Sequence, residues 1–509
     1  MKVIKFIFNR AALITLILLV QFVFVLFSVF YLTEYFWSYY FVLEIISILF
    51  ALGILNRDAD PSTKLPWIII ILLTPPFGLV IYLMFKTNNP IRKHLNMAKK
   101  LEAEIKFNSK TDADALKKLK RQPFAAVSQA KYLQGNNLFP VYTNTKTTFF
   151  SSGEEFFEEY LKQLSKAKKF IFMEYFILQQ GKMWREIEKV LIEKSKNGVE
   201  IVIMYDDIGS IYKLPYNFNK KLMQKTNIKV VKFNRFRPII SALHNNRDHR
   251  KLTIIDGKVA FTGGINIADE YINQKVLFGH WKDSAIMIEG KAVDTFTNEF
   301  LKLYHINGAE INKTENYFPV HKDFETEGFV QPFFDGPSPI YKDKIGENAY
   351  INMINQAKNY LYITTPYLII DYTFMSALKL AAKRGVDVRI ITPHVPDKKI
   401  IFMQTRSSYK TLLESGVKIY EYVPGFMHSK TIISDDQFAI VGTFNIDYRS
   451  FIHHFENGVW LYKTSSIKEI KKDIDKTIEK CKEIDFGNYG FNFFVRLSSN
   501  LLAIFSPLL

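Results

Sequence analysis

The chain contains one strand–helix–strand pattern twice, and this duplication restricts its fold more than any other feature of the sequence. The apolar strand, the helix and the buried strand fall at 168–178, 186–196 and 198–205 in the first copy and at 358–370, 374–384 and 385–392 in the second. Alternating strands and helices are typical of mainly parallel sheets with helices on their faces. The sequence therefore predicts an α/β fold of two pseudo-symmetric α/β/α domains that share one cleft.

Each copy carries the same polar motif, a histidine, a lysine and an aspartate with the spacing H-x-K-x4-D. The residues are His249, Lys251 and Asp256 in the first copy and His428, Lys430 and Asp435 in the second. Side chains two positions apart on a strand point to the same face, so each motif presents an imidazole and an ammonium group together. The two aspartates come after an apolar strand, and we expect them to position it rather than to transfer protons.

Each motif leads into a glycine-containing turn with an asparagine, Asn266 or Asn445, and then to a carboxylate, Asp283 or Glu456. We expect each asparagine to bring an amide donor to the site. We expect each carboxylate to accept the distal N–H of the histidine in its own copy. Such a hydrogen bond fixes the tautomer of the imidazole and raises its basicity.

This set of side chains suits chemistry on a phosphodiester. A neutral imidazole can attack phosphorus while an ammonium group holds a non-bridging oxygen. Two copies that face each other supply a nucleophile on one side of the phosphate and a general acid on the other. Two lysines and two amides already provide electrostatic stabilisation, so we expect neither a metal nor a cofactor. We interpret five of the histidines outside the pattern as structural or loop residues: His244, His280, His394, His453 and His454.

The N-terminal part of the chain is apolar enough to enter a membrane. Residues 11–32 and 67–85 contain no charged side chain, and 39–55 contains only Glu44. The first two of these segments are long enough to cross a hydrocarbon core of roughly 30 Å as helices. We therefore predict a multi-pass membrane domain over residues 1–86, with helices at about 11–32, 39–55 and 67–85.

The flanking charges give two answers for the side of the membrane that carries the rest of the chain. Basic residues before the first segment favour an N-terminus inside the cell, and three crossings then place the α/β part outside. Lys86, Arg92 and Lys93 follow the third segment and favour the inside for that part. If the segment 39–55 does not cross, two crossings remain and the α/β part lies inside.

Beyond residue 86 the chain holds 61 basic and 46 acidic residues, a net charge of +15. We predict a basic helical linker at 87–134, a first α/β domain at 135–335 and a second at 336–509, which ends in an apolar tail. A basic body beside a membrane suggests an anionic partner, either lipid headgroups or nucleic acid. The single cysteine, Cys481, excludes an intramolecular disulfide and a multi-cysteine metal site.

The paired motifs resemble those of the phospholipase D superfamily, and more closely those of bacterial cardiolipin synthases. The resemblance is carried by residues 65–85, 248–271, 385–397, 428–451, 455–459 and 506–509. It implies a phosphatidyltransferase of the bacterial cell membrane that converts two phosphatidylglycerol molecules into cardiolipin and glycerol through a phosphohistidine. Family habit assigns His249 as the nucleophile and His428 as the acid and base, a choice that the symmetry of the sequence does not decide.

Two other activities suit the same motifs. A lipid hydrolase would use water as the acceptor, and a phosphodiesterase acting on nucleic acid would suit the positive charge. The membrane segments argue against nucleic acid, so the expected partners are phosphatidylglycerol, cardiolipin and an anionic membrane surface. An inactive membrane-anchored scaffold is a third interpretation, which the intact residues of both motifs oppose.

Overall fold

The computed structural model describes residues 16, 19–20, 22–24, 26–27, 36–58, 60–75, 77–86, 112–135, 139–235, 245–309, 311, 313–338, 340–341, 343–485 and 502–506. These residues fall into two compact units, and each is described by itself. The first unit contains the described residues before 90 together with Asn245 and 502–506. The second unit is the α/β body, which contains 112–235 and the described residues from 246 to 485.

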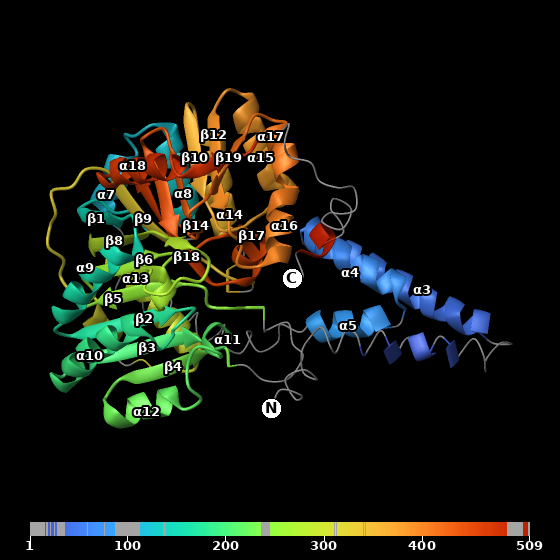
Figure 1. The fold of residues 1–509 in the computed structure, drawn as a ribbon, viewed down its shortest axis with the longest axis horizontal. Helices are drawn as coiled ribbons and strands as arrows, with labels where there is room; N and C mark the ends of the chain where they lie inside the picture. Colours follow the sequence, from blue (N-terminus) through green and yellow to red (C-terminus); the bar gives the residue numbers. More distant parts are fainter. Residues whose placement is uncertain are drawn as a thin grey trace. The chain divides into compact units, whose positions relative to one another are not determined.

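The first unit is built from apolar helices. Its helices are α3 (Phe36–Leu55), α4 (Pro61–Leu73) and α5 (Phe77–Lys86) (Figure 1). Among the described residues, α3 is the one helix long and apolar enough to cross a membrane, over Ser38–Leu55. Large apolar side chains such as Phe41 and Leu49 are exposed along it, as expected for a helix in contact with lipid. Ile54, Ile71 and Tyr82 form a small core that packs the three helices together.

The predicted membrane helices have different outcomes. The segment 39–55 lies within α3, whereas 11–32 falls mostly outside the described residues. The segment 67–85 is divided between α4 and α5, because the chain turns at Thr74 and Pro75. With 13 and 10 residues, these helices are about 20 and 15 Å long, each too short to cross the hydrocarbon core alone.

The first half of the α/β body forms a seven-stranded sheet with the order β1-β8-β6-β5-β2-β3-β4. Its strands are β1 (Thr145–Phe150), β2 (Phe170–Tyr175), β3 (Glu200–Asp206), β4 (Lys229–Phe233), β5 (Lys251–Ile255), β6 (Val259–Gly263) and β8 (Ala285–Gly290). Strands β2, β3 and β4 are parallel, and the other pairs are antiparallel, so the expectation of a mainly parallel sheet is wrong and the sheet is mixed. The helices of this half are α9 (Gly153–Ser165), α10 (Lys182–Lys196), the short α11 (Asp207–Ser210), α12 (Phe218–Lys225) and α13 (Val293–Ile306).

The second half repeats this strand order, which confirms the duplication predicted from the sequence. Its sheet has the order β9-β18-β16-β15-β10-β12-β13, with β19 added at the edge. The strands are β9 (Phe329–Asp335), β10 (Tyr360–Thr364), β12 (Asp387–Pro393), β13 (Lys418–Tyr422), β15 (Thr431–Ser434), β16 (Phe438–Gly442), β18 (Glu456–Tyr462) and β19 (Cys481–Glu483). The helices are α14 (Ile345–Gln356), α15 (Tyr372–Lys383), α16 (Lys399–Ser407), α17 (Tyr409–Leu413) and α18 (Ser466–Ile478).

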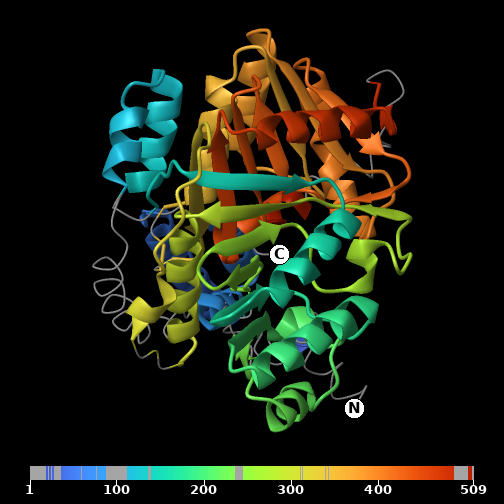
Figure 2. The ribbon, with the colours of Figure 1, turned by 90° about the vertical axis from the view of Figure 1, so that its left-hand side faces the viewer.

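The central strands are buried on both faces, as their continuous apolar sequences require. Along β2, Phe172 belongs to a core that continues into the second half, while Ile171 and Met173 belong to a core made almost entirely of first-half residues. Figure 2 shows α9 and α10 on one face of the first sheet and α18 lying across strands of the second half. The halves also share a parallel strand pair, β7 (His280–Lys282) with β14 (Gly425–Met427).

The segments next to the predicted domain boundaries contact the second half. In the predicted linker, α8 (Phe124–Gln134) follows α7 (Ala113–Leu119), and Gln129 Nε2 donates to Ala349 O at 3.3 Å. Strand β9 pairs along its length with β18, although it lies before residue 336 in the sequence. The boundaries at 86, 134 and 335 stay predictions.

Candidate active site

His249 and His428 occupy equivalent places in the two halves. His249 lies two residues before β5, and its backbone N–H donates to Phe455 O at 2.9 Å. His428 lies between β14 and β15, and its backbone N–H donates to Lys282 O at 2.7 Å. The backbone of each histidine is therefore held by the other half. Phe455, which holds His249, comes just before Glu456, and Lys282, which holds His428, comes just before Asp283.

The side chains of the two histidines also pair with residues of the other half. His249 Nδ1 lies 2.8 Å from Glu456 Oε1, and His428 Nδ1 lies 2.6 Å from Asp283 Oδ2. The expectation that each histidine pairs with the carboxylate of its own copy is therefore wrong. The reason lies in the fold, since each carboxylate stands at the end of the sheet that faces the other half. The hydrogen bond of each imidazole therefore requires residues from both halves.

The two lysines belong to the same buried group. Lys251 Nζ donates to His249 O, and Lys430 Nζ donates to His428 O, so each ammonium group is held against its own motif. Both lysines are 1% exposed. The pKa of each lysine is influenced by both Asp283 and Glu456, which brings the charges of the two motifs into one electrostatic centre.

Burial makes the two imidazoles neutral at ordinary pH. It lowers the pKa of His249 to about 3, against the opposing charge of Glu456. Burial and the nearby lysines Lys430 and Lys251 hold the pKa of His428 well below its usual value. Because Nδ1 of each ring faces a carboxylate, the proton of the neutral ring sits there and the lone pair is on Nε2. Nε2 is therefore the atom of each ring that has a lone pair available for chemistry.

The carboxylates and lysines carry the charge of the site. Burial opposes ionisation of Glu456, yet His249 and Lys251 hold the pKa of Glu456 well below the usual range of a glutamate. Burial raises the pKa of Asp283 to about 6, and the charge of Lys430 limits the rise. Burial also lowers the pKa of Lys251 to about 8 and that of Lys430 to about 7.

A glycine makes room for Asp283. A Cβ atom added at Gly264 would lie 1.9 Å from Asp283 Oδ1, so any other residue would push the carboxylate away from His428. The turn that follows β6 is therefore glycine-rich for a steric reason that concerns the site itself.

The two predicted asparagines have different surroundings. Asn266 accepts from the backbone N–H of Ile177 at 2.9 Å and donates to Tyr271 OH at 2.7 Å. The Tyr271 ring lies 5.4 Å from the His428 ring, so Asn266 supports the imidazole of the other half through this tyrosine. Asn445 is buried, and its Oδ1 has no hydrogen-bond partner among the described residues. It stays a predicted donor to substrate.

Asp256 and Asp435 do not reach the histidines. Asp256 accepts the backbone N–H groups of Lys168, Lys169 and Phe170, and Asp435 accepts those of Lys358, Asn359 and Tyr360. Asp256 follows β5, a strand of five residues, so it lies about 17 Å along the strand from the motif's lysine. Both aspartates lie at the strand end opposite the lysines and hold the start of the neighbouring strand, and their positioning role stays a prediction.

The sequence pattern missed two rings that flank the site. His454 lies two residues before Glu456, and its ring centroid is 5.4 Å from that of His249. Trp281 lies two residues before Asp283, and its ring centroid is 5.2 Å from that of His428. Their equal offsets from the two carboxylates are the signal in the sequence that would have found them.

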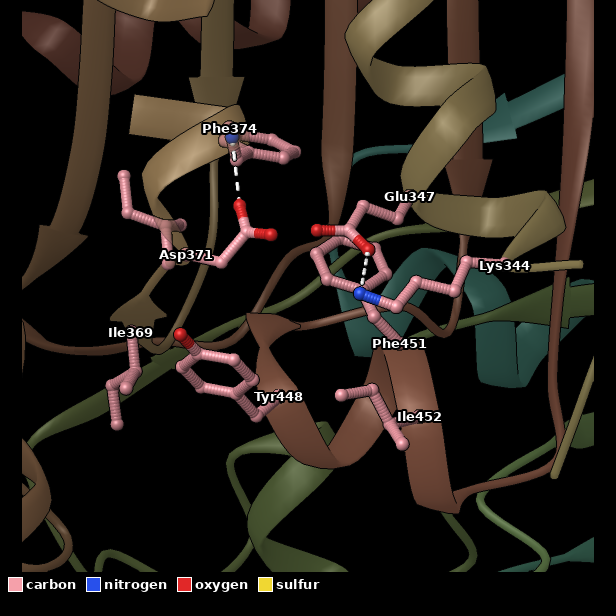
Figure 3. A pocket seen from close by; sticks show the side chains of 9 residues that line it. Lys344, Glu347, Ile369, Asp371, Phe374, Tyr448, Phe451 and Ile452 are labelled. Carbon is pink, nitrogen blue, oxygen red and sulfur yellow. Dashed lines mark hydrogen bonds and ion pairs between the residues drawn. The ribbon is translucent and has the colours of Figure 1, made fainter. Parts of the chain in front are cut away.

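A separate small hollow lies in the second half and does not include the histidines. It is lined by Asp371, Phe374, Phe451, Lys344 and Glu347, among others (Figure 3). Asp371 caps α15 through the Phe374 N–H, and Lys344 pairs with Glu347 at 2.8 Å. Its volume of about 10 Å³ is enough for one water molecule and excludes a lipid headgroup.

Comparison with known proteins places this architecture in a class. The structure of phosphatidylserine synthase from Haemophilus influenzae Rd KW20 superposes with a TM-score of 0.56 over 75% of this chain and 98% of that one, at 16% identity, which shows the fold. A family model described as PLD-like matches both halves, so the two equivalent sheets belong to a phospholipase D-type protein.

Sequence comparison identifies the family. A family model described as "Cardiolipin synthase, PLD-like domain" matches residues 160–304 and 350–478, and one described as "Phospholipase D-nuclease N-terminal" matches 45–86. The cardiolipin synthase of Halalkalibacterium halodurans is 34% identical over 94% of this chain and 96% of its own length. An uncharacterized protein of Streptococcus mutans is 42% identical over 85% of this chain and 93% of its own. The chain belongs to the family of PLD-like cardiolipin synthases and is a phosphatidyltransferase enzyme.

Proposed function

We propose that the chain transfers the phosphatidyl group of one phosphatidylglycerol to the glycerol hydroxyl of a second, which yields cardiolipin and glycerol. The observation that carries this proposal is the shared centre, in which each histidine is completed by the carboxylate of the other half. The family supports a phospholipid substrate, since its named members are cardiolipin synthases.

In the first step, His249 Nε2 attacks phosphorus, and the bond between phosphorus and the glycerol oxygen breaks. His428 gives a proton to the leaving glycerol oxygen. The arriving phosphodiester anion favours the protonated imidazole that this step needs, because an anion nearby stabilises the charged form. Glu456 stabilises the positive charge that develops on the His249 ring. Lys251 and Lys430 hold the non-bridging oxygens.

In the second step, His428 removes the proton from the hydroxyl of the second phosphatidylglycerol. The hydroxyl oxygen attacks phosphorus, and the phosphorus–nitrogen bond to His249 breaks. One phosphodiester replaces another, so no ATP is consumed. A covalent intermediate divides one difficult displacement into two easier ones.

Purified full-length protein in phosphatidylglycerol vesicles tests this proposal. We expect one glycerol to be released for each cardiolipin formed. Phosphatidic acid in place of cardiolipin would mean that water is the acceptor and that the chain is a lipid hydrolase. Nucleotides released from DNA, with no lipid product, would mean that it is a nucleic-acid phosphodiesterase.

The apolar helix α3 and the family together indicate a membrane protein. We further propose a multi-pass arrangement in the bacterial cell membrane in which 11–32 and α3 both cross. Two crossings return the chain to the side of its N-terminus. The basic residues before the first segment and those after Lys86 then share the inner side, which removes the conflict between the two flanks. This places the α/β body inside the cell.

Cysteine labelling tests the topology well because Cys481 is the single native cysteine. In a Cys481→Ser background, a cysteine near residue 33 should react with a membrane-impermeant reagent added outside intact cells. A cysteine at Lys463, beyond β18, should react only after lysis. Labelling of the second position in intact cells would contradict the inside placement.

A further inference from the structure

One group of side chains beside the site has the composition of a metal centre. Among the described residues, His249, His454 and Glu456 are the group whose nitrogen and oxygen atoms come together, all within 4.8 Å of one another. All three are buried, with exposures of 6, 7 and 0%. Burial of two imidazoles and a carboxylate in one place is expensive unless the groups bind something.

The hydrogen bonds of this group are incomplete. Both ring nitrogens of His454 and Oε2 of Glu456 lack hydrogen-bond partners among the described residues. His454 Nδ1 lies 3.7 Å from Glu456 Oε1, beyond hydrogen-bond distance, while His249 Nδ1 lies 2.8 Å from the same oxygen. Two ring nitrogens therefore converge on one carboxylate oxygen, and the His454 ring has no hydrogen-bond partner among the described residues.

The second half offers an internal comparison. Trp281 takes the place of His454 in the pair formed by His428 and Asp283, at a similar ring separation of 5.2 Å. An indole has a donor N–H and no lone pair for a metal. The pseudo-symmetry of the molecule is therefore broken at this position, and only the half-site of His249 has two imidazoles.

We propose that His249, His454 and Glu456 bind a divalent transition metal ion such as Zn²⁺, and that the bound ion blocks turnover. Two nitrogens and one oxygen are a ligand set that zinc favours, whereas magnesium favours oxygen ligands alone. Ligand atoms around tetrahedral zinc lie about 3.3 Å apart, given zinc–ligand distances of about 2.0 Å. The site closes on the ion with ring movements on the order of 1 Å, and water takes the fourth position.

Zinc binding changes the position of the proton on His249. The proton on His249 Nδ1 is lost to solvent, Nε2 takes one up so that the ring stays neutral, and Nδ1 coordinates the ion. Glu456 changes from accepting the Nδ1 proton to ligating the ion. Nε2 then carries the proton of the ring and has no lone pair for attack on phosphorus. Zinc therefore removes the stabilisation that Glu456 gives the nucleophile. The inhibitory part of this inference rests on the proposed function, whereas the binding part does not.

Binding is tested on the metal-free, full-length protein in detergent, with zinc titrated against a chromophoric chelator. We expect one equivalent to bind, and the dissociation constant to rise by about 10²-fold in His454→Asn and in His454→Gln. Cobalt gives a second measurement, since a tetrahedral site with these ligands shows intense visible absorption that the variants should lose. Thermal melting of each variant establishes that it is folded.

His321→Asn is the matched control. His321 also pairs with a carboxylate, since its Nε2 lies 2.7 Å from Asp294 Oδ1, but it belongs to no candidate metal-binding group among the described residues. It should leave zinc binding unchanged. Wild-type protein that binds no stoichiometric zinc, or His454 variants that bind it as tightly, would overturn the proposal.

The effect on turnover is measured separately, with each variant compared with its own metal-free rate. One equivalent of zinc should inhibit the wild-type protein, His454→Asn should need about 10²-fold more zinc, and magnesium should not inhibit. Zinc binding without inhibition would overturn the inhibitory part. Zinc binding in a protein that forms no cardiolipin at all would instead contradict the proposed function and leave the site in place.

Discussion

His249 Nδ1 lies 2.8 Å from Glu456 Oε1, although the two residues are 207 positions apart and belong to opposite halves of the α/β body. The mirror relationship joins His428 to Asp283 at 2.6 Å. Each imidazole thus depends on both halves for its orientation. This exchange makes the duplicated fold one catalytic unit rather than two linked copies.

The crossed hydrogen bonds assign Glu456 to His249 and Asp283 to His428. Glu456→Gln should lower kcat by about 10²- to 10⁴-fold with little change in KM, because an amide leaves the His249 tautomer undefined and does not stabilise the charged ring. Asp283→Asn should act in the same way through His428. Initial rates of cardiolipin formation over a range of phosphatidylglycerol contents give both constants.

His305→Asn serves as the control for these variants, since His305 bonds Ala309 O in the last turn of α13 and lies outside the motifs. It should retain the wild-type rate. Full activity in Glu456→Gln or in Asp283→Asn would show that the crossed pairs are structural.

The lysines predict an alkaline limit to activity. Burial lowers the pKa of Lys251 to about 8 and that of Lys430 to about 7, so both lose their positive charge as the pH rises through this range. Neutral lysines do not hold the phosphate oxygens. The value of kcat/KM, which reports the free enzyme, should therefore fall above about pH 7.

The Lys430→Arg variant distinguishes the contribution of Lys430 to the pH profile from that of Lys251. A guanidinium keeps its charge, so the fall in kcat/KM should move up toward the pKa of Lys251, by about one pH unit. A profile that stays flat to pH 9 in the wild-type protein would contradict the assignment of the lysines to phosphate binding.

Asp435 should matter for stability more than for chemistry. It accepts three backbone N–H groups at the start of β10 and has a left-handed φ of 54°. Asp435→Ala removes these acceptors and strains the backbone, at a cost of about 2–4 kcal/mol. Asp435→Asn keeps an acceptor and tolerates this φ, so its loss should be about half. Thermal melting gives the order, and the folded fraction of each variant should keep most of its specific activity.

Removal of metals should not reduce turnover, because lysines supply the positive charge at the phosphate. Treatment with EDTA, followed by gel filtration, should leave the rate equal to or above that of untreated protein. A rate that falls with the chelator and returns with added metal would contradict the metal-free mechanism and the inhibitory role of zinc together.

The duplicated frame and the two motifs were readable from the sequence because strand periodicity and motif spacing are local properties. The pairing of His249 with Glu456 was not, since spacing along the chain does not reveal which half a carboxylate faces. His454 was set aside for a related reason. A lone histidine gains meaning only when folding brings it beside another ring.

The N-terminal helices show a different limit. Hydropathy treats 67–85 as one apolar segment, and Pro75 and Gly78 within it indicate a kink. In the structure this kink is a full turn, in which Gly78 closely approaches Ile70. A Cβ atom at Gly78 would lie 2.3 Å from Ile70 O, so this glycine allows α5 to fold back against α4. Composition gives the apolar length of a segment, and the tertiary contacts decide whether that length is continuous.

The most direct measurement of the central claim is an experimental structure of the full-length protein with orthovanadate, which mimics a phosphoryl group in mid-transfer. We expect vanadium bonded to Nε2 of His249, Nε2 of His428 within hydrogen-bond distance of the opposite apical oxygen, and both lysines on equatorial oxygens. Vanadate bound by the histidine of one half, with the other imidazole turned away from it, would contradict a single phosphodiester centre shared by the two halves.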